Sequence, residues 1–349
     1  MSLLNKKDQR KELVFLDLSK IKYIEQDVYS PGVINFENLK IKACCLKCQK
    51  PKCLKIYTEE LICSNINDFP YDRFDDVCQR NAISWDYNNE CPVIDKSRCI
   101  NCTMCAMRCP TGAIYYDGDS MQISLELSEI HNTITLDNCY AEKHQEMLNL
   151  VSKILVKRRF ISFTDTMVKN IYTNIVAFII KEKKQNYFVR NLLIQVGANS
   201  CTSRIGDVYT RMDGIYQLNG HRGPIEVEFG TDSLEASRGI LDDVAVLQTR
   251  YNLKKEEQTP LVVCLSLPNK RQGYYQVIKD IKNVLNIEIR TITLGTLLLL
   301  AWNGRNLCFE NSLYYIDFDN LSLINYIQLD LHKYCYLPEN ELGIFEPKK

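Results

Sequence analysis

One run of cysteines constrains this chain more strongly than any other feature of its sequence. The stretch CINCTMCAMRCPTGAI places Cys99, Cys102, Cys105 and Cys109 at the spacing C-x2-C-x2-C-x3-C-P. Three thiolates on one tight loop can occupy three corners of an iron–sulfur cubane, and the fourth, which a proline follows, can serve another cluster. Zinc instead prefers two separated C-x2-C pairs. The run therefore predicts a [4Fe–4S] site.

The other cysteines are unevenly distributed, and the rest of the sequence favours reduced thiols. Eleven of the 16 cysteines lie between Cys44 and Cys109, and five are scattered through the later residues. The first residues, MSLLNKKDQRKELVF, lack the apolar stretch of a secretory signal. No run approaches the roughly 20 apolar residues that a membrane-spanning helix needs. We therefore expect a cytoplasmic protein, not a membrane protein, whose cysteines hold metal rather than form disulfides.

The overall charge is balanced, with 43 Lys and Arg against 43 Asp and Glu. This balance excludes a globally basic nucleic-acid coat or an acidic tail, but it does not exclude a local patch. Six lysines and no acid lie between Lys40 and Thr58. This stripe indicates either contact with an anionic partner or a solvated lysine face.

A second, altered half-motif lies upstream of the main run. In CCLKCQKPKCLKI, the cysteines Cys45, Cys48 and Cys53 follow the pattern C-x2-C-x2-P-x-C. Tyr57 stands where a fourth cysteine is expected. The half-motif predicts a second cluster whose fourth ligand is displaced.

An internal repeat identifies the displaced ligand. CQRNAISWD, which begins at Cys78, aligns with CPTGAIYYD, which begins at Cys109. The segments share the cysteine, an Ala-Ile pair, an aromatic residue and an aspartate. Cys78 is therefore the expected ligand, after an insertion that costs little loop entropy. Cys91, which precedes a proline, is the rival, although it aligns with Gln122 in an expected hairpin strand.

Residues 40–125 resemble two-cluster bacterial ferredoxin domains, in particular iron–sulfur subunits with the C-x2-C-x2-P-x-C variant. The resemblance implies two [4Fe–4S] clusters, each with three cysteines from one run and one from elsewhere. One cluster would take Cys45, Cys48, Cys53 and Cys109, and the other Cys99, Cys102, Cys105 and Cys78. Such clusters either carry electrons or hold a fold together.

The second half of the chain has a mixed α and β pattern. The fall in cysteine density places a boundary near Ile130–Leu136, so we expect domains over residues 1–130 and 131–349. Helical periodicity predicts helices over 137–159, 162–184, 232–252 and 276–286. Strand patterns occupy 206–220, 223–230, 260–268 and 287–294. This order predicts an α/β (α+β) domain with a mixed central sheet flanked by helices, after a ferredoxin-like domain.

Three acids of the second half suggest a metal site. Asp213 lies on one expected strand, and Glu226 and Glu228 lie two residues apart on the next, so those two share a face. Like charges among apolar residues are costly unless a cation neutralises them, and Mg²⁺ suits carboxylate ligands. Alternatives stay open: Asp207 in place of Asp213, Glu142 or Glu146 as a fourth carboxylate, and an amphipathic strand whose acids face solvent.

Residues 140–300 resemble the PD-(D/E)XK superfamily of restriction-endonuclease-like nucleases. The stretch EVEFGTDSLEASRGILDD, with Arg238 in its helix, is most similar to restriction endonucleases of the BamHI/BglII type. The resemblance implies a Mg²⁺-dependent DNA endonuclease whose metal ligands are Asp213, Glu226 and Glu228. Glu228 replaces the usual lysine and would position or deprotonate the attacking water. Double-stranded DNA as substrate, a homodimer and a restriction or phage-defence role are implied in the same way.

Two other functions compete with this hypothesis. An electron-transfer protein would use the clusters for redox chemistry and would not depend on Asp213. A redox-sensing DNA-binding protein would keep an inactive nuclease fold and bind DNA through the lysine stripe. His221 is expected in an exposed turn, and a role as a catalytic base stays open.

Overall fold

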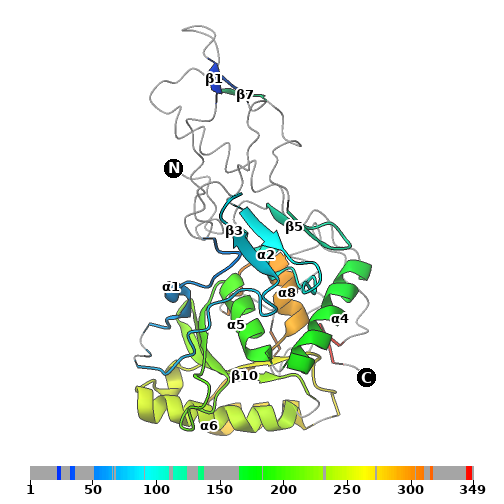
Figure 1. Ribbon diagram of the computed structural model, residues 1–349. Helices are drawn as coiled ribbons and strands as arrows, with labels where there is room; N and C mark the ends of the chain where they lie inside the picture. Colours follow the sequence, from blue (N-terminus) through cyan, green and yellow to red (C-terminus); the bar gives the residue numbers. More distant parts are fainter. Residues whose placement is uncertain are drawn as a thin grey trace. The chain divides into compact units, whose positions relative to one another are not determined.

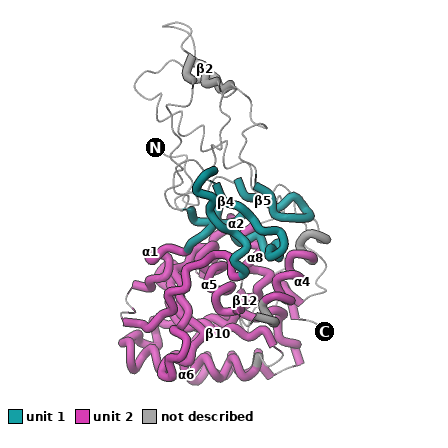
Figure 2. The backbone as a smooth tube through the Cα atoms, viewed as in Figure 1, with its two compact units in different colours: residues 1–55, 80–161 teal, residues 56–79, 162–349 magenta. Residues whose placement is uncertain are grey.

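The chain forms two compact units, which are coloured separately in Figure 2. The first comprises Met1–Lys55 and Arg80–Ile161, and the second Ile56–Gln79 and Ser162–Lys349. The computed structural model describes residues 22–24, 32–35, 51–64, 66, 68–89, 91–109, 113–123, 133–136, 165–182, 184–230, 233–271, 273–302, 304–309, 315–316 and 343–347. The helix expected over 137–159 lies outside these residues.

Among its described residues, the first unit contains short antiparallel strands and one short helix. Its strands are β1 (Lys22–Ile24), β2 (Gly32–Asn35) and β7 (Thr133–Leu136) in one sheet, β3 (Ile83–Asp86) with β4 (Cys91–Ile94), and β5 (Ile114–Tyr116) with β6 (Met121–Ile123). The helix is α2 (Met104–Arg108). The two hairpins match the sequence repeat, since β3 begins five residues after Cys78 and β5 five residues after Cys109. Cys91 begins a hairpin strand, as its alignment predicts.

The second unit is built on a five-stranded sheet of order β12-β11-β10-β9-β8. The strands are β8 (Asn199–Thr202), β9 (Gly214–Leu218), β10 (His221–Glu228), β11 (Leu261–Cys264) and β12 (Arg290–Thr293). The first three form an antiparallel meander, whereas β10, β11 and β12 run parallel. The mixed sheet confirms the α/β pattern predicted from the sequence.

Helices cover both faces of this sheet, as Figure 1 shows. On one side α6 (Ser233–Tyr251) packs on β10 and β11 and contacts α7 (Tyr274–Leu285). On the other side α5 (Gln185–Gln195) packs on β8, β9 and β10 and contacts α4 (Asp165–Glu182) and α8 (Leu294–Trp302). The crossover through α6 carries the chain from β10 to the parallel strand β11.

The apolar periodicity of the two longest helices is confirmed in the core. Ile171, Ile175 and Phe178 of α4 are buried, as are Ile240, Val244 and Leu247 of α6. Leu234 and Leu241, which were also expected to point inward, are only partly buried. No helix of the described residues is long and apolar enough to cross a membrane.

Residues Ile56–Gln79 belong to the second unit, whereas cysteine density places them in the first. They include α1 (Thr58–Leu61), which packs on β8. The buried Arg190 of α5 donates from Nη1 to the carbonyl oxygen of Phe74, 2.6 Å away, and Asn191 donates to that of Val77 at 3.3 Å. Without these donors the two buried carbonyl oxygens would lack hydrogen-bond partners, so α5 helps to hold the segment in the second unit.

Candidate functional site

The antiparallel pair β9–β10 brings Asp213 beside the two glutamates. Asp213 immediately precedes β9, and the register pairs Gly214 with Ile225, next to Glu226. Its Oδ2 accepts a hydrogen bond from the backbone nitrogen of Val227 at 2.8 Å. Its Oδ1 accepts another from Nδ2 of Asn186, on α5, at 2.6 Å. Two donors on different elements therefore fix this carboxylate against the end of β10.

Glu226 points towards α6, in the middle of the acidic cluster. A β-carbon on Gly239 of α6 would lie 3.9 Å from Oε1 of Glu226, so the helix passes close to this carboxylate. The pKa of Glu226 is raised to about 8, mainly by burial and then by the charges of Asp213, Asp243 and Glu228 in that order. Glu226 thus lies among like charges in a partly dry environment, which costs free energy when all are ionised.

Asp243 of α6 is a fourth acid that the sequence analysis did not identify. Its side chain is 5% exposed. Burial raises its pKa to about 7, with a smaller contribution from Asp213 and then Asp242. Its position in the sequence could have revealed it. Asp243 lies three residues after Ile240 and next to Val244, on the face of α6 that packs against the sheet. An acid in an apolar helical stripe is costly unless something compensates its charge.

Asp213 and Glu228 are the other two acids of this cluster. Burial raises the pKa of Asp213, although its hydrogen bonds from Val227 and Asn186 act in the opposite direction. Glu228 ends β10, is partly buried, and accepts a hydrogen bond from the nitrogen of Gly230 at 2.5 Å. The charge of Glu228 raises the pKa of both Asp213 and Glu226, and the charges of Asp213 and Asp243 also raise that of Glu226. All three acids predicted from the sequence are therefore neighbours.

The arrangement fits an open magnesium site rather than a closed cage. Within the described part of the chain, no three His, Cys, Asp or Glu side chains converge as ligands of one ion. Mg²⁺ is usually held by one or two carboxylates and keeps several waters for exchange with substrate phosphate oxygens. The carboxylates are hard oxygen donors that repel one another, and the buried Oδ1 of Asn186 has no hydrogen-bond partner in the described part of the chain. These features suit a hydrated cation.

Other residues singled out in the sequence lie elsewhere. Asp207 caps the loop before β9, where its Oδ1 accepts from the nitrogens of Tyr209 and Thr210 at 2.9 and 3.2 Å. Arg238 is an exposed residue of α6 that pairs with Glu235 at 2.7 Å. His221 is not in an exposed turn but begins β10, partly buried, because its Nδ1 lies 3.1 Å from Oγ1 of Thr259. Glu142 and Glu146 lie outside the described residues.

The cysteine run of the first unit surrounds α2. Asn101 and Thr103 have positive φ angles of 57° and 64°, which turn the backbone tightly between Cys99 and the start of the helix. Cys105 lies in α2 and Cys109 ends it, with 4% of Cys109 exposed. The described cysteines form no disulfide. Each thiolate of a [4Fe–4S] cluster binds a different iron atom, so four thiolates around the cluster need not converge on one point.

Arg108 ties the altered half-motif to this helix. It is 5% exposed and donates from Nε to the carbonyl oxygen of Lys52 at 2.8 Å and from Nη2 to that of Lys55 at 3.2 Å. Both carbonyls flank Cys53, which is buried. The turn that carries Cys53 is therefore fixed against the helix that ends at Cys109.

Comparison with known proteins bears on this run. Residues 92–115 match a 4Fe-4S binding domain. The chain therefore contains iron–sulfur-binding residues, and the matched segment includes Cys99, Cys102, Cys105 and Cys109. No curated protein and no solved structure matches the chain.

The match to a 4Fe-4S binding domain supports one cluster and leaves the second as a prediction. Cys45 and Cys48 lie outside the described residues. Cys78 belongs to the second unit and Cys99 to the first, so its role as a ligand beside Cys99 also stays a prediction.

Proposed function

We propose that the protein is a Mg²⁺-dependent DNA endonuclease that carries an iron–sulfur domain. The observation that supports this most strongly is the gathering of Asp213, Glu226, Glu228 and Asp243 where β9 begins and β10 ends. The order α5-β8-β9-β10-α6-β11 around these acids agrees with the resemblance to PD-(D/E)XK nucleases. In this reading the nuclease part is the second unit.

The side chains divide the work of phosphodiester hydrolysis. Asp213 and Glu226 would hold the metal, and Asn186 would keep Asp213 oriented through its 2.6 Å hydrogen bond. Bound Mg²⁺ would stabilise the charge on the leaving oxygen and lower the pKa of a coordinated water. Glu228, at the exposed end of β10, would accept the proton of the attacking water. Asp243 would lie behind the metal ligands and strengthen their attraction for a cation.

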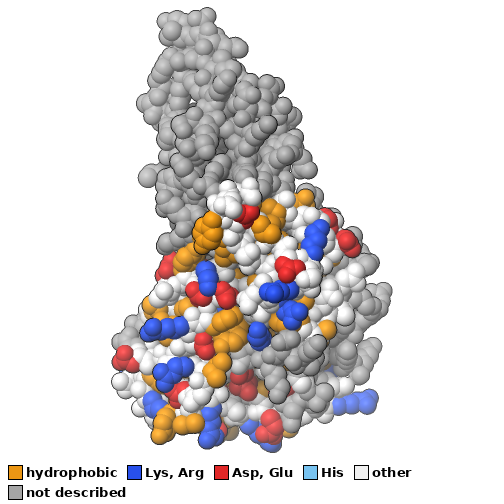
Figure 3. Space-filling model, viewed as in Figure 1, with side chains coloured by type: hydrophobic (Ala, Val, Ile, Leu, Met, Phe, Trp, Pro, Cys, Tyr) orange, Lys and Arg blue, Asp and Glu red, His pale blue; other side chains and the backbone are white. Residues whose placement is uncertain are grey.

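The loop between β8 and β9 is suited to contact DNA next to these acids. Ile205, Val208 and Tyr209 are 78%, 70% and 71% exposed, and Arg204 and Arg211 are exposed beside them. Arg250 of α6 donates to the carbonyl oxygen of Tyr209 and lies 5.5 Å from its ring centroid. Arginines supply phosphate contacts, and apolar side chains can enter a groove. Elsewhere on the face shown in Figure 3, basic and acidic side chains are interspersed.

The iron–sulfur domain would act as a structural or DNA-contacting module. The buried guanidinium of Arg108 fixes the Cys53 turn through two hydrogen bonds to backbone carbonyls. A turn fixed in this way favours a rigid, structural role for the domain. The lysine stripe between Lys40 and Lys55 would add contacts to the DNA backbone. A homodimer, which could cut both strands, and a cytoplasmic restriction or phage-defence role belong to the same proposal.

Cleavage of long, sequence-diverse, unmodified DNA by the anaerobically purified full chain tests this function. We expect discrete fragments with Mg²⁺ and none without it. Asp213→Asn and Glu226→Gln should abolish cleavage while the cluster absorbance persists. Glu235→Gln, an exposed acid in the same unit, is the control and should cut normally. Intact DNA from protein with full cluster content would refute the endonuclease and favour a redox role for the clusters.

A further inference from the structure

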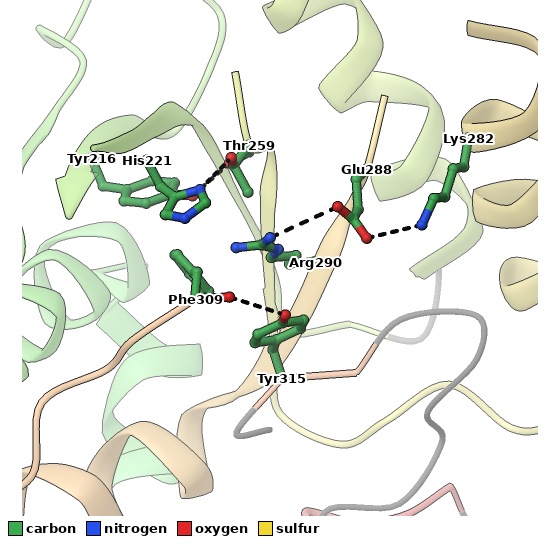
Figure 4. Close-up of polar contacts among 8 residues, drawn as sticks. All are labelled: Tyr216, His221, Thr259, Lys282, Glu288, Arg290, Phe309 and Tyr315. Atoms are coloured by element: carbon green, nitrogen blue, oxygen red, sulfur yellow. Dashed lines mark hydrogen bonds and ion pairs between the residues drawn. The ribbon is translucent and has the colours of Figure 1, made fainter. Parts of the chain in front are cut away.

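Arg290, at the start of β12, is a buried cation whose hydrogen bonds are incomplete. Its side chain is 9% exposed. Both Nε and Nη1 are closed off from solvent and have no hydrogen-bond acceptor among the residues that the structure describes. The remaining nitrogen, Nη2, lies 3.8 Å from Oε2 of Glu288, too far for a direct hydrogen bond. Figure 4 shows Arg290 with the residues around it.

Aromatic rings enclose this guanidinium. Its Cζ lies 4.7 Å from the ring centroids of both Phe309 and Tyr315. His221 and Tyr216 contact the Phe309 ring at centroid distances of 5.6 and 5.8 Å. The hydroxyl of Tyr315 donates to the carbonyl oxygen of Phe309 at 3.3 Å, which links the two chain segments that carry these rings.

Backbone hydrogen bonds hold both segments in place. The nitrogen of Leu307 donates to the carbonyl oxygen of Val196 at 2.9 Å. Ile316 and Thr291 of β12 exchange two backbone hydrogen bonds, at 2.9 and 2.7 Å. Thr291 follows Arg290 directly, so the rings over Arg290 are anchored to the strand that carries it.

The contacts of Arg290 do not balance the loss of its hydration. Cation–π contacts recover part of the lost hydration, but two N–H groups without acceptors and an ion pair as long as 3.8 Å leave the buried charge poorly compensated. Glu288 offers little compensation, because it is 40% exposed and accepts a 3.0 Å hydrogen bond from Nζ of Lys282. A water could accept from the free N–H groups but would leave the charge unbalanced.

We propose that Arg290 is the anchor of a binding site for a phosphate group, either inorganic phosphate or a phosphate monoester. A phosphate would supply acceptor oxygens for Nε and Nη1 and the missing negative charge.

Arg290 lies on β12, two strands away from β10 in the sheet, and at the end of the parallel strands opposite Glu228, whereas Glu226 is one register position along. Arg290 pairs in register with Leu261, and Leu261 with Ile225. Glu228 instead pairs with Cys264, and Cys264 with Thr293. The phosphate site is therefore separate from the proposed magnesium site and does not depend on nuclease activity.

Thermal unfolding of the full chain, purified anaerobically and freed of Mg²⁺, tests the site with inorganic phosphate at constant ionic strength. We expect a saturable rise in the unfolding midpoint of the unaltered protein. Arg290→Met should weaken phosphate binding at least tenfold. Glu288→Gln should strengthen it severalfold, because the substitution removes a competing carboxylate. Non-specific stabilisation by phosphate would instead grow without saturation and equally in every variant.

Three results would overturn the proposal. The first is a response that does not saturate in the unaltered protein. The second is unchanged phosphate affinity in Glu288→Gln. Because Glu288 is partly exposed, this variant keeps the test decisive if Arg290→Met does not fold. The third is saturation by acetate at lower concentration than by phosphate, which would make this a carboxylate site.

Discussion

Replacing Asp243 with asparagine should stabilise the metal-free protein at high pH. The pKa of Asp243 rises from its ordinary 3.8 to about 7 on folding. Between these values the folded state holds a proton that the unfolded state has lost, so the free energy of unfolding falls as pH rises from about 4 to about 7. Above pH 7 the folded protein carries the full cost of this buried charge.

The magnitude follows from the shift of roughly three pKa units, which corresponds to about 4 kcal/mol at 1.36 kcal/mol per unit. Asparagine removes this cost, but its buried amide lacks partners, which costs about 1–2 kcal/mol. We therefore expect Asp243→Asn to raise the free energy of unfolding by about 2 kcal/mol at pH 8.5 without metal. At pH 5, where Asp243 is protonated, the gain should disappear.

Urea unfolding under anaerobic conditions, at pH 5 and 8.5 and with or without Mg²⁺, measures these differences. Asp242→Asn is the matched control, because Asp242 is the exposed neighbour of the buried Asp243 and should change little. Mg²⁺ should stabilise the unaltered protein more than Asp243→Asn, since the variant has lost one attracting charge. A variant that is less stable at pH 8.5, or equally affected at both pH values, would refute the electrostatic reasoning.

Three further predictions concern the contacts around the two sites. Arg108→Met should lower the iron content of the purified protein, whereas Arg98→Met, at an exposed position, should not. Equal iron content in the two variants would contradict a role for Arg108 in fixing the Cys53 turn. Arg204→Glu with Arg211→Glu should raise KM for DNA about tenfold or more and flatten its salt dependence, as measured by initial cleavage rates, with kcat little changed. Asn186→Leu should lower kcat about tenfold to a hundredfold, because Asp213 loses the hydrogen bond that orients it. Normal turnover in this variant would argue against a positioning role for Asn186.

The sequence was most informative where residue spacing decides the structure. The period-2 spacing of Glu226 and Glu228 and the apolar stripes of α4 and α6 follow from backbone geometry, so they were predictable. The hairpin β3–β4 followed from the alignment of Cys78 with Cys109. These features depend on residues close together in the chain.

Features that depend on distant contacts were not predictable. Asp243 lies in the apolar stripe of α6, but only the packing of α6 on β10 shows that it is buried among other acids. Strand β8, with the sequence NSCT, has no apolar alternation and is defined by its pairing with β9. His221 was misplaced because its partner, Thr259, lies 38 residues away.

Because Ile56–Gln79 packs in the second unit, it has no partners while it is being synthesised on the ribosome. Asn199, whose Nδ2 donates to the carbonyl oxygen of Glu59, lies 140 residues later in the chain. At about 5–20 residues per second, Ile56–Gln79 must wait on the order of 10 s for its partners to be made. The cysteines up to Cys109 emerge during this interval. Cluster insertion is therefore expected to precede closure of the second unit, and slow delivery of iron and sulfide would prolong the exposure of an unpartnered segment.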